Sequence, residues 1–177
     1  MFNNSIVSIN KNKIQDTTKD IKNNPTKNKS GKIKETDIRF TQGSTFKLLK
    51  ELTNVNWREA YDPTPKSSKR DTLDKDWNKK ANIFLNPPFS KARFFVKKLV
   101  EEMEKHSSIK KALIILPWYF VEDKKERVTS GAKWLKSLRR RMGKFNYKKY
   151  HLKNQDFYNP IDKKMTKVRV YAIYLSR

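Results

Sequence analysis

The tetrapeptide Asn86-Pro87-Pro88-Phe89 is the stretch of this chain whose residue types and order best suit chemistry. It follows the apolar run Asn82–Leu85, and its two prolines fix the backbone and supply no N–H donors. The amide of Asn86 and the nearby carbonyls can accept both protons of an exocyclic amino group, which turns the nitrogen lone pair toward an electrophile. The ring of Phe89 can stack on a planar base that is single-stranded or flipped out of a duplex. These residues suit methylation of an amino nitrogen. The simpler interpretation is a turn that only ends a strand.

The spacing of apolar residues predicts the elements that position this turn. Helices are expected over residues 44–52, 90–105 and 122–142 (with a break near residue 131), and strands over 57–61, 82–85, 112–116 and 168–175. Glu101, Glu102 and Glu104 are expected on the solvent face of the second helix. This alternation predicts an α/β fold with a mainly parallel sheet, in which ligands bind at the carboxyl ends of strands. The turn at Asn86 follows one such end.

Further motifs flank the tetrapeptide. Residues 44–52 place leucines as in a Thr-Pro-x-x-Leu-Phe-x-x-Leu helix, although without its proline. Asp62-Pro63-Thr64 ends the second expected segment, residues 71–77 read Asp-Thr-Leu-Asp-Lys-Asp-Trp, and residues 113–118 are an apolar run that ends in Pro-Trp. In this order, from about residue 40 to 120, the motifs resemble those of the phage-type (Dam-like) DNA N6-adenine methyltransferases.

This resemblance implies a compact Rossmann-like methyltransferase fold. It also implies an enzyme that transfers a methyl group from S-adenosylmethionine to the exocyclic amino group of a flipped adenine in DNA. The residues that it assigns to the adenine site are Asn86, Pro87, Pro88 and Phe89. The residues that it assigns to the methyl donor are Asp62 and Asp71, with Ser44 and Thr45 closing the pocket. Two carboxylates suit an ammonium group and ribose hydroxyls; two solvated loop aspartates are the alternative.

The chain also departs from the family pattern. Only eight residues separate Asp62 from Asp71, and no glycine-rich first motif is present. The body is short for this fold, so a trimmed fold is expected. The alternative function is therefore a non-catalytic nucleic-acid-binding protein on a degenerate methyltransferase scaffold.

The charge of the chain indicates a polyanionic partner. The 177 residues carry 42 Lys and Arg against 18 Asp and Glu, a formal net charge of +24. Residues 1–35 are polar, carry +5 and are expected to form a disordered basic tail, which leaves +19 on one domain over residues 36–177. Within that domain an amphipathic basic helix offers phosphate contacts through Lys133, Lys136, Arg139, Arg140 and Arg141. Residues 144–153 alternate aromatics and lysines, which fits either a stacking surface or an edge strand with one face in the core.

The composition excludes several other classes of function. No cysteine is present, and His106 and His151 lack metal-ligand spacing, so no metal site is expected. The longest apolar run, residues 112–121, is too short to span a bilayer, and an intracellular protein is expected, in a bacterial or viral host's cytoplasm or in a nucleus. The expected partner is DNA, with RNA left open, while the positive charge argues against a protein acceptor.

Overall fold

The computed structural model describes residues 39–64, 72–121, 130–160 and 162–177. The elements of this part are β1 (Phe40–Thr41), α1 (Gly43–Thr53), β2 (Asn82–Leu85), the 3-10 helix η3 (Phe89–Lys91), α2 (Ala92–Lys105), β3 (Lys111–Pro117), α3 (Trp118–Val121), α4 (Ser130–Met142), β4 (Asn146–Asn159) and β5 (Lys164–Ser176). The expected tail, residues 1–35, lies outside the described residues, as do Asp71 and the first part of the helix expected over 122–142.

The fold is α/β, but its sheet is mostly antiparallel. The five strands lie in the order β1-β4-β5-β3-β2, and only β2 and β3 run parallel. The expectation of a mainly parallel sheet was therefore wrong. The reason is that a short turn joins β4 directly to β5, and two strands joined in this way must pair antiparallel.

The strand expected over residues 57–61 is reduced to a single bridge. Tyr61 pairs in parallel with Ile83 on the outer edge of β2. The Tyr61 N–H donates to the carbonyl of Asn82 over 2.9 Å, and the Phe84 N–H donates to the carbonyl of Tyr61 over 2.9 Å. This bridge brings the residues that follow Tyr61 to the carboxyl end of β2.

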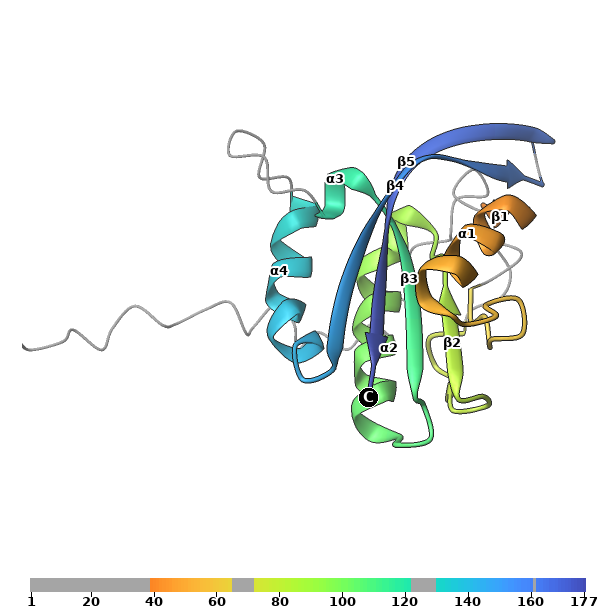
Figure 1. The fold of residues 1–177 in the computed structure, drawn as a ribbon. Helices are drawn as coiled ribbons and strands as arrows, with labels where there is room; N and C mark the ends of the chain where they lie inside the picture. Colours follow the sequence, from red (N-terminus) through yellow and green to blue (C-terminus); the bar gives the residue numbers. More distant parts are fainter. Residues whose placement is uncertain (1–38, 65–71, 122–129, 161) are drawn as a thin grey trace, which may run out of the picture.

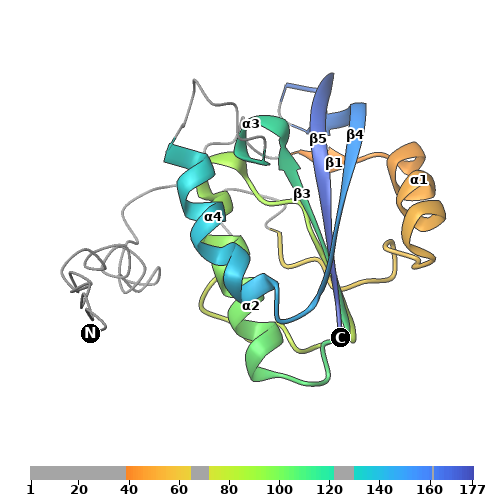
Figure 2. The ribbon, with the colours of Figure 1, turned by 60° about the vertical axis from the view of Figure 1, so that its left-hand side comes forward.

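Helices cover both faces of the sheet, because residues of the central strands alternate between two cores (Figure 2). On β3, Ile114 and Leu116 pack with α2 and α4, whereas Leu113 and Ile115 pack with α1. Strands buried on both faces read as continuous apolar runs, and this is why β2 and β3 were predicted well. None of the helices in the described part of the chain has the length and apolarity needed to cross a bilayer.

Helix α2 departs from the expected pattern at one glutamate. The side chain of Glu102 is only 2% exposed, so its expected place on the solvent face is wrong. It accepts a hydrogen bond of 2.8 Å from the backbone N–H of Trp77 and forms a 2.8 Å ion pair with Lys98. A buried carboxylate requires such partners. Glu102 thereby fastens the segment before β2 to α2.

Candidate active site

A cavity of about 520 Å³ lies where the carboxyl end of β2 meets β1 and the start of α1. Its lining consists of Arg39, Phe40, Thr41, Gly43, Phe46, Trp57, Arg58, Ala60, Asp62, Thr64, Phe84 and Asn86. Aromatic rings, two guanidinium groups, one carboxylate and one amide thus share a single site. Ligands of open α/β sheets bind at this edge.

Asn86 is the buried polar group of this site, at 5% exposure. Its side-chain amide donates to the carbonyl of Arg39 over 2.9 Å and to Oγ1 of Thr41 over 3.1 Å. These two bonds fix the orientation of the amide. Its Oδ1 is buried and has no hydrogen-bond partner among the described residues. A buried acceptor without a partner costs free energy unless a ligand donates to it.

Arg39 lines the same cavity and carries a second unsatisfied group. Its Nη1 is buried and has no partner within the described residues. Arg58, which also lines the cavity, lies over the ring of Phe46 at 5.8 Å and occupies the space above Gly43, where a Cβ would meet it at 2.6 Å. The lining of the cavity therefore includes two arginines and the aspartate Asp62.

Asp62 and Thr64 connect the cavity to the turn at Asn86. Oδ1 of Asp62 accepts from the backbone N–H of Thr64 over 2.8 Å, which folds the chain back after the bridge at Tyr61. Oγ1 of Thr64 then accepts from the backbone N–H of Asn86 over 3.3 Å. Asp71 lies outside the described residues, but the next residue, Thr72, donates to the carbonyl of Pro63.

The structure places Ser44 and Thr45 on α1, beside the cavity rather than in its lining. Ser44 is exposed. Thr45 is buried, and its hydroxyl hydrogen-bonds Oε1 of Gln155 over 3.0 Å. Thr45 therefore joins α1 to β4, while the neighbouring Gly43 lines the cavity.

The rest of the tetrapeptide continues from Asn86 as a rigid turn. Pro87 and Pro88 are buried, and Phe89 is half-buried at the start of η3. The Lys91 N–H donates to the carbonyl of Pro88 over 2.9 Å, which closes the 3-10 turn. Trp118, just after the neighbouring strand β3, lies under the guanidinium of Arg169 at 5.4 Å.

The basic helix α4 has the orientation that its sequence pattern predicts. Leu135, Leu138 and Met142 are buried in the core shared with α2. The exposed cations of this helix are Lys133, Lys136, Arg139 and Arg140. Arg141 is engaged elsewhere: its Nη2 donates to Glu104 of α2 over 2.5 Å. This bond lowers the pKa of the Glu104 carboxyl and raises the pKa of the guanidinium.

One cluster has the composition of a metal site. Ligand atoms of Asp76, Glu102 and His106 lie within 4.8 Å of one another. However, Lys98 pairs with Glu102 and Lys105 pairs with Asp76, and the hydrogen bond from Lys105 lowers the pKa of that aspartate. Because lysines already neutralise these carboxylates, we assign the cluster a structural role.

Sequence reasoning missed Arg39 and Thr41 as residues of the site. Arg39 is one of 42 cations in the chain, and Thr41 belongs to a two-residue strand, so neither carries a motif. The sequence feature that could have indicated these two residues is their position just before the motif in residues 44–52. Their roles come from tertiary contacts with Asn86.

Comparison with known proteins bears on this site directly. No curated protein and no solved structure shows significant similarity to the chain. One family model does match, over the residues that include the Asn-Pro-Pro-Phe turn and the strands on either side of it. The resemblance inferred from the motifs is thus confirmed: residues 63–118 are similar to the family described as DNA N-6-adenine-methyltransferase (Dam).

Proposed function

We propose that this protein is a DNA adenine-N6 methyltransferase that uses S-adenosylmethionine. The observation that carries the proposal is the buried Oδ1 of Asn86, an acceptor held in place by Arg39 and Thr41 and left without a partner among the described residues. The exocyclic amino group of an adenine is a donor of the kind that such an oxygen requires. The family match around Asn86 supports the same assignment.

The cavity fits the methyl donor in its chemistry. The methionine part of S-adenosylmethionine carries a carboxylate, for which the unpartnered Nη1 of Arg39 is a suitable donor. Asp62 suits the ammonium group or the ribose hydroxyls, and the rings of Phe46 and Trp57 suit the adenine of the donor. When bound, the donor supplies an electrophilic methyl group.

The proposed reaction gives each residue of the tetrapeptide that contacts the base a role, although only Asn86 among these four lines the cavity. Oδ1 of Asn86 accepts one proton of the target amino group and orients its nitrogen lone pair. The carbonyl of Pro87 is a candidate for the second proton, because neither proline has an N–H that would repel the amino group. Phe89 stacks on the flipped base, and the proton leaves after the methyl group has been transferred.

The test is formation of N6-methyladenine in duplex DNA by the purified full chain with S-adenosylmethionine, measured by mass spectrometry of the digested nucleosides. We expect the wild type to form the modified base and Asn86→Ala to lose about 100-fold or more in rate, the loss typical of removing one group positioned for a transition state. The control is Asn78→Ala, which removes an exposed amide and should keep full activity. Competition between DNA and RNA substrates decides which nucleic acid is preferred.

A second candidate function is binding of nucleic acid without catalysis. The observation that favours it is the edge beyond β2, where the described residues continue the sheet only by the bridge at Tyr61. A methyl donor bound there would therefore contact less of the sheet than it would in a full doubly wound fold. Unmodified adenine, together with retained DNA binding, would support this candidate and overturn the first.

A further inference from the structure

The outer halves of β4 and β5 extend beyond β3 and β2, and only the short strand β1 pairs with them. The last residue of β3, Pro117, pairs with Val170, whereas β5 begins at Lys164. The stretch that pairs Gln155–Asn159 with Lys164–Val168 therefore has no β3 beside it. It projects past the edge where β2 and β3 end, and Figure 1 shows it curling above β1 and α1. We call residues 153–160 and 162–169 the projecting hairpin.

The projecting hairpin is held in a fixed place beside the cavity. Thr41 of β1 pairs with Phe157 of β4, and the same Thr41 accepts a hydrogen bond from the amide of Asn86. Phe157 is fully buried in the core beneath α1, and Gln155 is bonded to Thr45. One short strand thus touches both the hairpin and the catalytic candidate, which fixes the distance between them.

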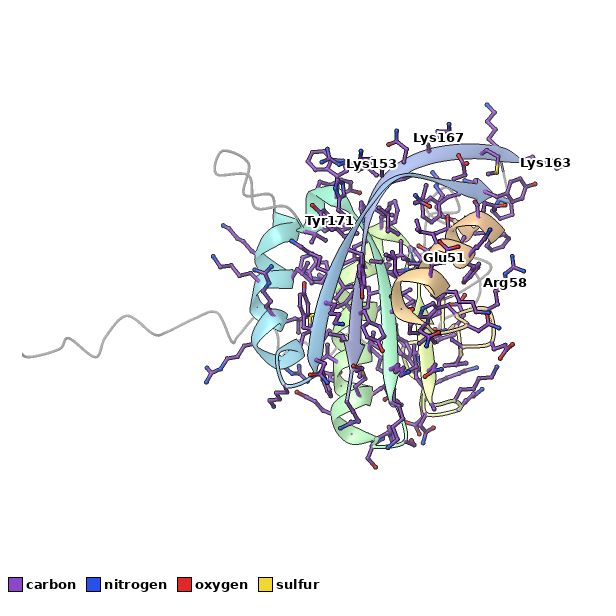
Figure 3. The ribbon with its side chains drawn as sticks, in the orientation of Figure 1. Glu51, Arg58, Lys153, Lys163, Lys167 and Tyr171 are labelled. Atoms are coloured by element: carbon purple, nitrogen blue, oxygen red, sulfur yellow. The ribbon has the colours of Figure 1, made fainter. Side chains whose placement is uncertain are left out.

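The surface of the projecting hairpin is cationic. Its exposed basic side chains are Lys153, Lys163, Lys164, Lys167 and Arg169. Its sequence contains two acids, Asp156 and Asp162. Asp162 is bonded to Asn159 within the turn, and Asp156 lies opposite Lys167 in the strand register. Figure 3 shows Lys153, Lys167 and Lys163 spread along the outer arc of the hairpin.

Apart from its pairing with β4, the first part of β5 exposes its side chains to solvent, so its cationic surface has no role in packing within the described chain. Lys164, Met165, Thr166 and Lys167 are consecutive and all exposed, so both faces of the strand meet solvent. Met165 alone is 54% exposed. At the base of the hairpin, Arg169 is bonded to His151 over 2.9 Å, and His151 stacks on Tyr171 with ring centres 4.8 Å apart. These contacts join β4 to β5 at the base of the hairpin.

We propose that the projecting hairpin grips the phosphate backbone of the duplex beside the adenine that enters the cavity. A two-stranded ribbon fits the width of the DNA major groove, and exposed lysines on both faces suit the phosphates that flank it. The hairpin overhangs the edge that holds Asn86, so a duplex lying on it presents its bases to that edge. The proposal rests on the proposed function, because it takes DNA as the substrate, and it adds a binding surface apart from α4.

The test removes three charges from the hairpin. The variant Lys163→Gln/Lys164→Gln/Lys167→Gln is compared with a control, Lys75→Gln/Lys79→Gln/Lys110→Gln, whose lysines are exposed and precede the amino ends of β2 and β3. Binding of a fluorescent duplex oligonucleotide is measured by anisotropy over a range of salt concentrations. Each phosphate contact contributes about 0.9 to the slope of log K against log salt, so we expect the hairpin variant to lose about 2 to 3 from that slope. The control should keep the wild-type slope, and both variants should keep the wild-type melting temperature.

The outcomes separate this proposal from the proposed function. A hairpin variant with the wild-type slope, or a control that loses as much as the hairpin variant, would overturn the hairpin surface. If the wild type leaves adenine unmodified while the hairpin variant alone loses DNA affinity, the enzymatic function falls and the surface stands. If the triple variant is less stable, the single variants carry the test, and each should lower the slope by about 1.

Discussion

Two buried atoms define the candidate site at the scale of single residues. Oδ1 of Asn86, an acceptor, and Nη1 of Arg39, a donor, belong to residues that line the same cavity, and both atoms are buried without a partner among the described residues. Each unsatisfied group costs about 1–3 kcal/mol when buried. In the proposed function two molecules offset these costs: the amino group of the target adenine donates to Oδ1 of Asn86, and the carboxylate of the methyl donor accepts from Nη1 of Arg39.

We expect the guanidinium of Arg39 to contribute to binding of the methyl donor. Arg39→Leu removes the donor and keeps much of the apolar stem, so we expect the Kd for S-adenosylmethionine to rise about tenfold, the loss of one charge-assisted hydrogen bond. Titration calorimetry on the full chain measures it. The matched control is Arg93→Leu, which removes an exposed guanidinium of α2 that lies over Phe94. An unchanged Kd in Arg39→Leu would contradict the role given to this side chain.

Sequence reasoning identified the part of the site that carries a motif. Asn86 and Asp62 were expected from the residue order, and both line the cavity. Glu102 was expected in solvent because a glutamate among lysines fits a polar face, whereas the backbone N–H of Trp77 needed a buried acceptor. Such needs arise only when segments far apart in the sequence meet. For the same reason, the sequence did not indicate that Arg39 belongs to the site.

Among the elements, α2 and α4 are held together by their shared apolar core and by the carboxylate of Glu104. Glu104 accepts hydrogen bonds from Nη2 and Nε of Arg141, at 2.5 and 3.3 Å, and from Lys144 at 3.3 Å. The hydrogen bond from Arg141 is the main cause of the lowered pKa of Glu104. A forked contact of this kind holds the basic helix against the body. It also leaves fewer donors on Arg141 for a phosphate than the exposed cations of α4 have.

Stability should therefore depend on pH through Glu104. Because its pKa is lowered from the ordinary 4.5 in the folded state, its contribution is present above pH 4.5 and is lost as the pH falls through the folded value. We expect Glu104→Gln to lower the free energy of unfolding by about 0.5–1 kcal/mol at pH 7. This difference should vanish in acid, as urea unfolding at several pH values would measure. The control is Glu51→Gln, an exposed carboxylate of α1; an equal loss there would contradict a specific role of Glu104.

The elements divide into those that the sequence predicts and those that it does not. Strands β2 and β3 were predicted because burial on both faces makes them apolar throughout. The first part of β4 was expected only as one of two alternatives, because residues 144–153 also fit a stacking surface. The outer halves of β4 and β5 were not predicted, because runs of exposed residues such as Lys164–Lys167 show no regular alternation of apolar and polar side chains. β5 pairs antiparallel with β3, and the sequence of a strand does not determine which strand it will pair with.

At the scale of the whole molecule, the net charge of +24 is spread over distinct surfaces. The exposed face of α4 and the projecting hairpin both carry cations, and Figure 1 shows them in different places: α4 lies to one side of the sheet, and the hairpin curls above β1 and α1. A polyanion can therefore contact the body on more than one side. In the part of the chain that the structure describes, the sheet continues beyond β2 only by the bridge at Tyr61.

The central claim is that the cavity beside Asn86 holds a methyl donor. The most direct measurement is titration calorimetry of S-adenosylmethionine into the folded wild-type chain, with the demethylated product S-adenosylhomocysteine as competitor. We expect saturable binding at one site per chain, displaced by the competitor and weakened by Asp62→Ala but not by Asp74→Ala, since Asp62 lines the cavity and Asp74 is an exposed residue outside its lining. No saturable binding, by protein that still binds DNA, would contradict it.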